Sequence, residues 1–111
     1  MTRMDEWRKE FYAEIARAES ARAKNNEGQA RVCARRAAGA VVREYFKRMG
    51  IPVRRPSAHE VLKLLAEQSH LSPPLKRAAD LLILRVDEEF KLPNGVDLID
   101  EAHRLKMLLN E

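Results

Sequence analysis

The sequence has few of the residues that mark a secreted, metal-binding or membrane-spanning protein. Its 111 residues include a single cysteine, Cys33, so no disulfide can form within the chain, and no Cys/His grouping has zinc-site spacing. The longest unbroken apolar run, Leu81 to Leu84, is far too short to span a membrane, and the N-terminus lacks an apolar signal core. We therefore expect a cytoplasmic protein with no membrane contact, no bound metal and no cofactor.

Aromatic residues are also scarce, at 5%, and β-branched residues are few beside abundant Ala, Leu, Arg, Lys and Glu. Such a composition is typical of helical proteins. With 45% hydrophobic residues, a chain of this length can bury one core. The sequence therefore predicts one all-α domain over residues 1–111.

Apolar residues spaced three and four apart predict five helices, over about 5–24, 29–49, 58–69, 73–91 and from 98 to the C-terminus. The expected core positions are Met4, Trp7, Phe11, Ile15, Ala18, Ala30, Cys33, Ala37, Val41, Tyr45, Met49, Val61, Leu62, Leu65, Leu75, Ala79, Leu82, Val86, Phe90, Leu98, Ala102, Leu105 and Leu109. Turn and cap residues separate the helices: Asn25-Asn26-Glu27-Gly28, Gly50, Ser57, Ser72-Pro73 and Asp97. Because all connections are short, we expect an up-and-down antiparallel bundle of four long helices and one short one.

Two positions are unusual for a simple bundle. Gly39 lies in the middle of the second helix, where glycine costs about 1 kcal/mol relative to alanine. A close approach of another backbone would explain a glycine at this position. The alternative is that position 39 is exposed and acquired glycine by chance. The run Leu81 to Leu84 makes the fourth helix apolar around most of its circumference, so we expect this helix to be central and to contribute to a homodimer contact.

Positive charge is concentrated in one third of the chain. The segment from Lys24 to Arg55 has nine basic and two acidic residues, a net charge of +7, whereas the rest has twelve basic and fifteen acidic residues, a net charge of −3. This asymmetry indicates an acidic partner.

Cations of the second helix stand at multiples of four residues, and we call them the basic ridge: Arg31, Arg35, Arg43 and Lys47, with Arg36 and Arg48 beside them. The functional interpretation is a surface that binds the phosphates of RNA or of a nucleotide, since arginine matches phosphate oxygens. The alternative is pairing within the bundle, because the first helix carries acids at the same spacing: Glu6, Glu10 and Glu14.

The loop before the third helix adds Arg54 and Arg55, close to His59 at the second position of that helix. The functional interpretation of His59 is a neutral imidazole that binds a ligand or accepts a proton. The alternative is a local hydrogen bond with a structural role. No glycine-rich phosphate loop, nucleophile elbow or dinucleotide fingerprint occurs, so we predict no catalytic residue. The remaining candidates are expected to be inert: His70 and His103 on the surface, and Cys33 buried.

Taken in order, these segments resemble the HEPN family of nucleotide-binding helical bundles. The resemblance covers about residues 14–109 and depends on three stretches: Ala21–Phe46 with the small-residue centre Ala37-Ala38-Gly39-Ala40, the helix of Ser57–Leu65 with His59, and Ala78–Gly95. It implies a bundle that dimerises and binds a nucleotide, RNA or a partner protein. Members of the family pair with small nucleotidyltransferases, and several are ribonucleases of toxin–antitoxin systems with an Arg-xxxx-His motif.

This motif is not found where the resemblance would place it. The fourth helix reads Arg85-Val86-Asp87-Glu88-Glu89-Phe90, with phenylalanine in the position of the histidine. Arg54 to His59 has the right spacing but runs through Pro56 and a helix cap. We therefore expect a non-catalytic HEPN-like binding module, with a ribonuclease toxin or a purely structural dimeric adaptor as alternatives.

Overall fold

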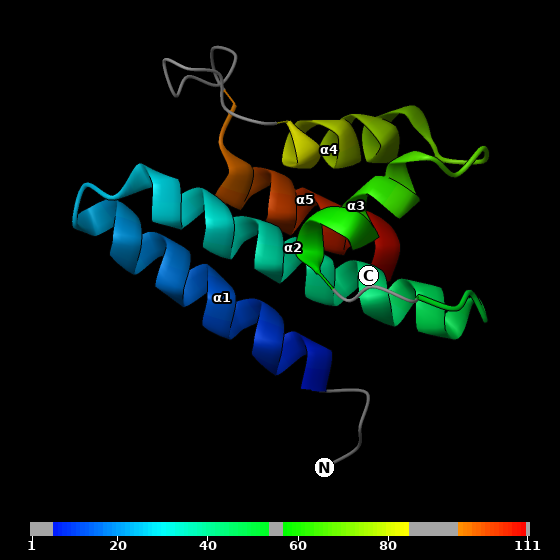
Figure 1. Ribbon diagram of the computed structural model, residues 1–111, viewed down its shortest axis with the longest axis horizontal. Coiled ribbons are helices and arrows are strands. Elements are labelled where there is room, and N and C mark those ends of the chain that lie inside the picture. The colour runs from blue at the N-terminus through cyan, green and yellow to red at the C-terminus, as the bar shows by residue number, and fades with distance from the viewer. Residues whose placement is uncertain (1–5, 54–56, 85–95, 111) are drawn as a thin grey trace.

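The computed structural model describes residues 6–53, 57–84 and 96–110, and within these residues it is helical with no strand (Figure 1). The helices are α1 (Glu6–Ala23), α2 (Glu27–Arg48), α3 (Ala58–Ala66), α4 (Pro73–Ile83) and α5 (Leu98–Asn110). The prediction of an all-α helical bundle is confirmed. None of the described helices has the length and apolar character needed to cross a membrane.

Helices α1 and α2 form an antiparallel hairpin (Figure 1). Asn25 adopts a left-handed backbone with φ of 62°, as expected for this turn. The side chain of Asn26 then accepts a hydrogen bond from the backbone N–H of Gln29 at 3.2 Å. This cap starts α2 at Glu27, two residues before the predicted start at Gln29.

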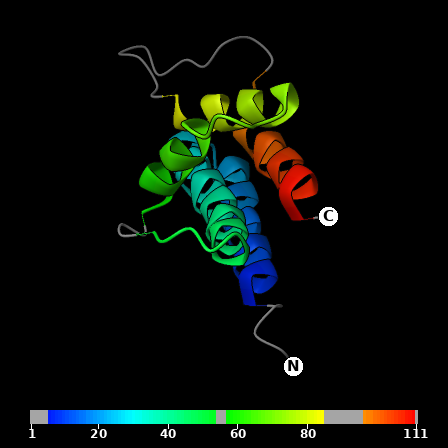
Figure 2. The same cartoon turned by 90° about the vertical axis from the view of Figure 1, so that its right-hand side faces the viewer.

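The central helix is α2, and the expectation that the fourth helix would be central was wrong. Helix α2 packs against α1, α3 and α5, whereas α4 packs mainly on α3 and α5. Figure 2 shows α3 and α5 on opposite sides of α2, with α4 lying across them. The physical reason is the small size of the buried side chains of α2, since its alanines allow neighbouring helices to approach from several directions.

Helix α4 is also shorter than predicted. It ends at Ile83, and Leu84 already has extended backbone with φ of −60° and ψ of 128°. The predicted continuation to Lys91, which includes Val86 and Phe90, lies outside the described residues beyond this point.

Gly39 lies where α3 begins, and the predicted close approach is confirmed. A Cβ atom at Gly39 would lie 3.0 Å from the Cβ and 3.1 Å from the Cα of Ala58. The contact is within the chain, between the middle of α2 and the first residue of α3. A side chain at this position would push the two helices apart.

The predicted core positions are largely buried, including Trp7, Phe11, Val41 and Leu105. Met49 is a clear exception, with 59% of its surface exposed. It follows the last residue of α2, and the chain turns away at Gly50, whose φ is +72°. The prediction also missed core residues on a second side of α2 because it assumed one buried stripe: Ala34, Ala38, Val42 and Phe46.

Candidate functional site

The four cations of the basic ridge do not form one surface. A step of four residues turns an α-helix about 40° beyond a full circle, so Arg31 and Lys47 point in directions about 160° apart. Arg31 is half-buried near the start of α2, and Lys47 is exposed near its end. Arg35 and Arg43, the ridge residues between Arg31 and Lys47, contact different helices.

Arg35 contacts the end of α4. Its Nε donates to the carbonyl oxygen of Leu82 at 2.8 Å, and its Nη2 donates to that of Leu84 at 2.7 Å. The last carbonyls of a helix lack partners within the helix and carry partial negative charge, so a guanidinium group stabilises them. Arg35 therefore joins α2 to α4.

Arg43 contacts α1 instead. Its Nη2 donates to Oε1 of Glu10 at 3.0 Å, so for this pair the alternative interpretation, pairing within the bundle, is confirmed. Glu14 pairs with Arg17 of its own helix at 3.0 Å. The expected pairing between the acidic residues of α1 and the basic ridge of α2 therefore holds for Glu10 and not for Glu14.

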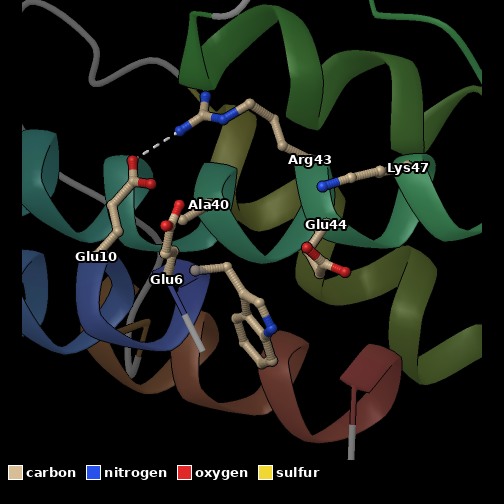
Figure 3. A pocket seen from close by; sticks show the side chains of 7 residues that line it. Glu6, Glu10, Ala40, Arg43, Glu44 and Lys47 are labelled. Atoms are coloured by element: carbon tan, nitrogen blue, oxygen red, sulfur yellow. Dashed lines mark hydrogen bonds and ion pairs between the residues drawn. The ribbon is translucent and has the colours of Figure 1, made fainter. Parts of the chain in front are cut away.

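One hollow of about 510 Å³ lies between α1 and α2 where the hairpin opens, and we call it the mixed groove. It is lined by Glu6, Trp7, Glu10, Ala40, Arg43, Glu44 and Lys47. In Figure 3, Glu6 and Glu10 reach up from α1, Arg43 lies above them, and Lys47 extends from α2 toward the same space from the right. Three carboxylates face two cations here, so this groove is a poor site for a phosphate.

A second hollow of about 500 Å³ lies between the same helices near their connection, and we call it the hairpin groove. It is lined by Arg17, Ser20, Ala21, Lys24, Asn26, Gln29, Cys33 and Arg36. This lining contains three cations and no carboxylate. Within the described residues, Lys24 and Arg36 form no ion pair, whereas Arg17 keeps its pair with Glu14 and is 65% exposed at the side chain. The hairpin groove is therefore more electropositive than the mixed groove.

The spacing of charges along one helix does not point to Arg17 or Lys24, because the groove takes cations from both sides of the turn. The signal was present in the hairpin itself, since folding the chain back at Asn25 and Asn26 brings Arg17 opposite the segment that contains Arg36. Charges from both sides of a turn then share one groove.

The other predicted side chains lie as follows. His59 is half-buried at the second position of α3, where Ser57 caps the helix by accepting from the N–H of Glu60 at 3.3 Å. Arg54 and Arg55 lie outside the described residues. Among the described residues His59 makes no hydrogen bond or ion pair, and its ligand-binding role stays a prediction.

Cys33 is buried, as expected, with 2% of its surface exposed, and its Sγ accepts from Nε2 of Gln29 at 3.6 Å. His70 is exposed, whereas His103 is half-buried with its ring edge-on to Phe11 at 5.3 Å. No group of three His, Cys, Asp or Glu side chains that could hold a metal ion occurs in the described part of the chain.

Arg22 joins three helices beside the hairpin groove, and we call this contact the Arg22 clamp. Its Nε donates to Glu27 at 2.7 Å, and its Nη1 donates to Asp97 at 2.9 Å. These hydrogen bonds raise the pKa of Arg22 above its ordinary value, and the bond with Glu27 has the larger effect. The clamp connects the end of α1 with the starts of α2 and α5.

Asp97 also caps α5, since its Oδ1 accepts from the backbone N–H of Ile99 at 2.9 Å. Burial alone would raise the pKa of Asp97, but the hydrogen bonds and charge of Arg22 and the backbone N–H groups of Ile99 and Asp100 outweigh burial. The pKa of Asp97 therefore lies below its ordinary value.

Comparisons with protein-family models, with curated proteins and with solved structures find no match for this chain. The HEPN resemblance thus stays a prediction.

Proposed function

We propose that this protein is a non-catalytic, HEPN-like binding module whose hairpin groove holds a phosphate group of a nucleotide or of RNA. The observation that carries the proposal is the lining of this groove, in which Arg17, Lys24 and Arg36 surround a hollow without any carboxylate. Guanidinium groups bind phosphate oxygens through paired N–H donors, and an ammonium group adds a compact charge.

The groove also offers groups that suit the rest of such a ligand. Ser20, Asn26 and Gln29 add hydroxyl and amide groups to the lining, which can hydrogen-bond to sugars and bases. The proposal moves the main phosphate contact away from the basic ridge, because Arg35 and Arg43 already bind carbonyls and a carboxylate within the chain. Of the other side chains predicted from the sequence, Arg31, Arg54, Arg55 and His59 are proposed as flanking contacts for a longer strand, whereas Lys47 lies among the carboxylates of the mixed groove.

The proposal includes the setting that the resemblance implies. We propose that the protein acts in the cytoplasm as a homodimer, and that a small nucleotidyltransferase is its partner protein. An acidic partner protein is the alternative occupant of the hairpin groove, since an acidic surface presents the same charge.

The direct test is fluorescence anisotropy with a short labelled single-stranded RNA at low salt. The double variant Lys24→Gln/Arg36→Gln should bind about tenfold more weakly or worse, and binding by the wild type should fall as salt rises because phosphate contacts release counterions. The matched control is Lys9→Gln/Lys63→Gln, which removes two exposed cations outside the groove and should bind like the wild type. Equal losses in both double variants would mean that net charge, and not the groove, attracts RNA.

We also predict that the purified protein does not cleave RNA. Cleavage needs a positioned base or acid together with a cation for the developing phosphate charge, and in this sequence only His59 with Arg54 or Arg55 offers that combination. Structured and unstructured RNA should be incubated with wild type and with His59→Ala in parallel. Cleavage by the wild type that is lost in His59→Ala would favour the ribonuclease alternative over a binding module.

A further inference from the structure

Glu14 is a charged residue on the buried face of α1, and it is not among the side chains that line the hairpin groove. It lies about one turn from Phe11 and from Ala18, and only 8% of the residue is exposed. Its Oε2 accepts from Nη1 of Arg17 at 3.0 Å. Its Oε1 is buried and has no hydrogen-bond partner in the described part of the chain. Within that part, the buried charge of Glu14 therefore depends on Arg17.

Arg17 connects this buried carboxylate to the hairpin groove, which it lines. The side chain of Arg17 is 65% exposed, whereas that of Glu14 is 11% exposed. A long side chain in solvent loses conformational entropy when a ligand immobilises it. Because burial fixes Glu14, its ion pair restricts Arg17 before any ligand arrives. The ion pair uses Nη1 of Arg17, and Nε and Nη2 make no hydrogen bond with a described residue.

A phosphate in the groove would not displace Glu14 from Arg17. If Arg17 left its ion pair, Glu14 would stay buried with no donor for either oxygen, which is strongly unfavourable. A guanidinium group has five N–H donors in a fixed plane, so Arg17 can contact Glu14 and a phosphate at the same time. The ion pair is therefore compatible with phosphate binding.

We propose that Glu14 is a positioning residue for the phosphate site. It holds the guanidinium group of Arg17 at the hairpin groove and leaves Nε and Nη2 for the phosphate. This inference rests on the proposed function and adds a carboxylate to a site that was identified by its cations. By electrostatics alone, removal of a negative charge strengthens binding to RNA. A positioning role predicts the opposite sign for Glu14.

The test is fluorescence anisotropy with the labelled single-stranded RNA at low salt. Glu14→Gln should bind about threefold more weakly than the wild type. The matched control is Glu101→Gln: Glu101 is 6% exposed and accepts from Arg104, three residues further on, at 2.7 Å, but this pair lines a different hollow beside α4. The control should bind RNA as tightly as the wild type or slightly more tightly. Binding by Glu14→Gln as tight as by Glu101→Gln would overturn the proposal.

A double-mutant cycle tests whether Glu14 acts through Arg17. Arg17→Gln should weaken RNA binding about tenfold, and the addition of Glu14→Gln should weaken it no further. A purely structural role for Glu14 would instead cause the same loss with and without Arg17. That result would also overturn the proposal.

NMR relaxation of the arginine Nε nuclei measures the positioning without RNA. Nε of Arg17 should be more rigid than that of Arg77, which is exposed and forms no ion pair with a described residue. Glu14→Gln should make the two arginines equally mobile. RNA binding by a wild type in which Arg17 is as mobile as Arg77 would overturn the positioning role and leave the proposed function standing. A rigid Arg17 in a protein that binds no RNA would overturn the proposed function, and with it the phosphate role of Glu14.

Discussion

The two ends of the α1–α2 hairpin have opposite electrostatic character although the same two helices build both. In the mixed groove, Arg43 of α2 meets Glu10 of α1, and further carboxylates surround Lys47. In the hairpin groove, Lys24 and Arg36 have no carboxylate among the lining residues. The first end uses its charges to hold the helices together, whereas the second keeps cations available. Basic residues on one helix thus divide into those that contact a neighbouring helix and those that line a groove without a carboxylate, according to what the neighbouring helix presents.

The largest effect is expected from disturbing the middle of α2, which lies between the two grooves. Gly39→Val should lower the free energy of unfolding by about 2–3 kcal/mol, because its side chain would collide with Ala58. The matched control is Gly28→Val, since a Cβ atom there meets only Oδ1 of Asn26 at 3.9 Å. Urea denaturation measures both, and equal losses would contradict the close contact with α3.

The second prediction separates two adjacent arginines of α2. Arg35→Ala should cost about 2 kcal/mol of unfolding free energy because two carbonyls at the end of α4 lose their donor. Arg36→Ala should change stability by less than about 0.5 kcal/mol and should weaken RNA binding instead. The measurements are thermal denaturation and anisotropy on both variants. Similar stability losses for the two arginines would show that the division into structural and binding cations is wrong.

The third prediction concerns the acid sensitivity of the end with the hairpin groove. The pKa of Asp97 is lowered in the folded protein, so its contribution to stability is present above the unfolded pKa of about 4 and is lost as pH falls through the folded pKa. Asp97→Asn keeps a capping oxygen but loses the charge that pairs with Arg22, so it should lower stability by about 1 kcal/mol at neutral pH and flatten the decline in acid. Denaturant titrations across this pH range measure the slope, and an unchanged slope in the variant would contradict the lowered pKa.

The smallest effect is expected at the mixed groove. Glu10→Gln removes the carboxylate that pairs with Arg43, but the side chains of both residues are partly exposed, at 50% and 31%. Such ion pairs contribute up to about 0.5 kcal/mol. A loss well above this value in urea denaturation would mean that this ion pair is central to the hairpin, and that the two ends differ more than their charges indicate.

The fold followed from sequence where local rules decide. The stripe of Trp7 and Phe11, the cap at Ser57 and the helix end at Gly50 were all readable, because each depends on spacing or on one residue's backbone preference. The order of packing was not readable, since the apolar run near Leu82 indicated a central α4. The small side chains of α2 make this helix the central one, because they allow α1, α3 and α5 to pack closely against it.

The candidate site was harder to predict than the fold. The cations of the basic ridge do recur at multiples of four residues. Each step of four residues turns the side chain further around the helix, however, so Arg35 and Arg43 contact different helices. Lys24 was counted in the basic segment and yet assigned no site, because its importance depends on Arg17 and Arg36 across the hairpin. Grooves formed by two helices are visible only after both are placed.

The Arg22 clamp has a consequence for how the hairpin groove forms during folding. Asp97 is 75 residues from Arg22 in the chain, whereas Glu27 is only five residues away. The hairpin can close early by local contacts, but the clamp forms only after the chain has returned and α5 has docked. Lys24 and Asn26 lie between the two clamped residues Arg22 and Glu27, so one wall of the groove takes its final form only when the C-terminal helix is in place. One wall of the groove therefore depends on a contact between distant parts of the chain, which is made only when both the hairpin and α5 are in place.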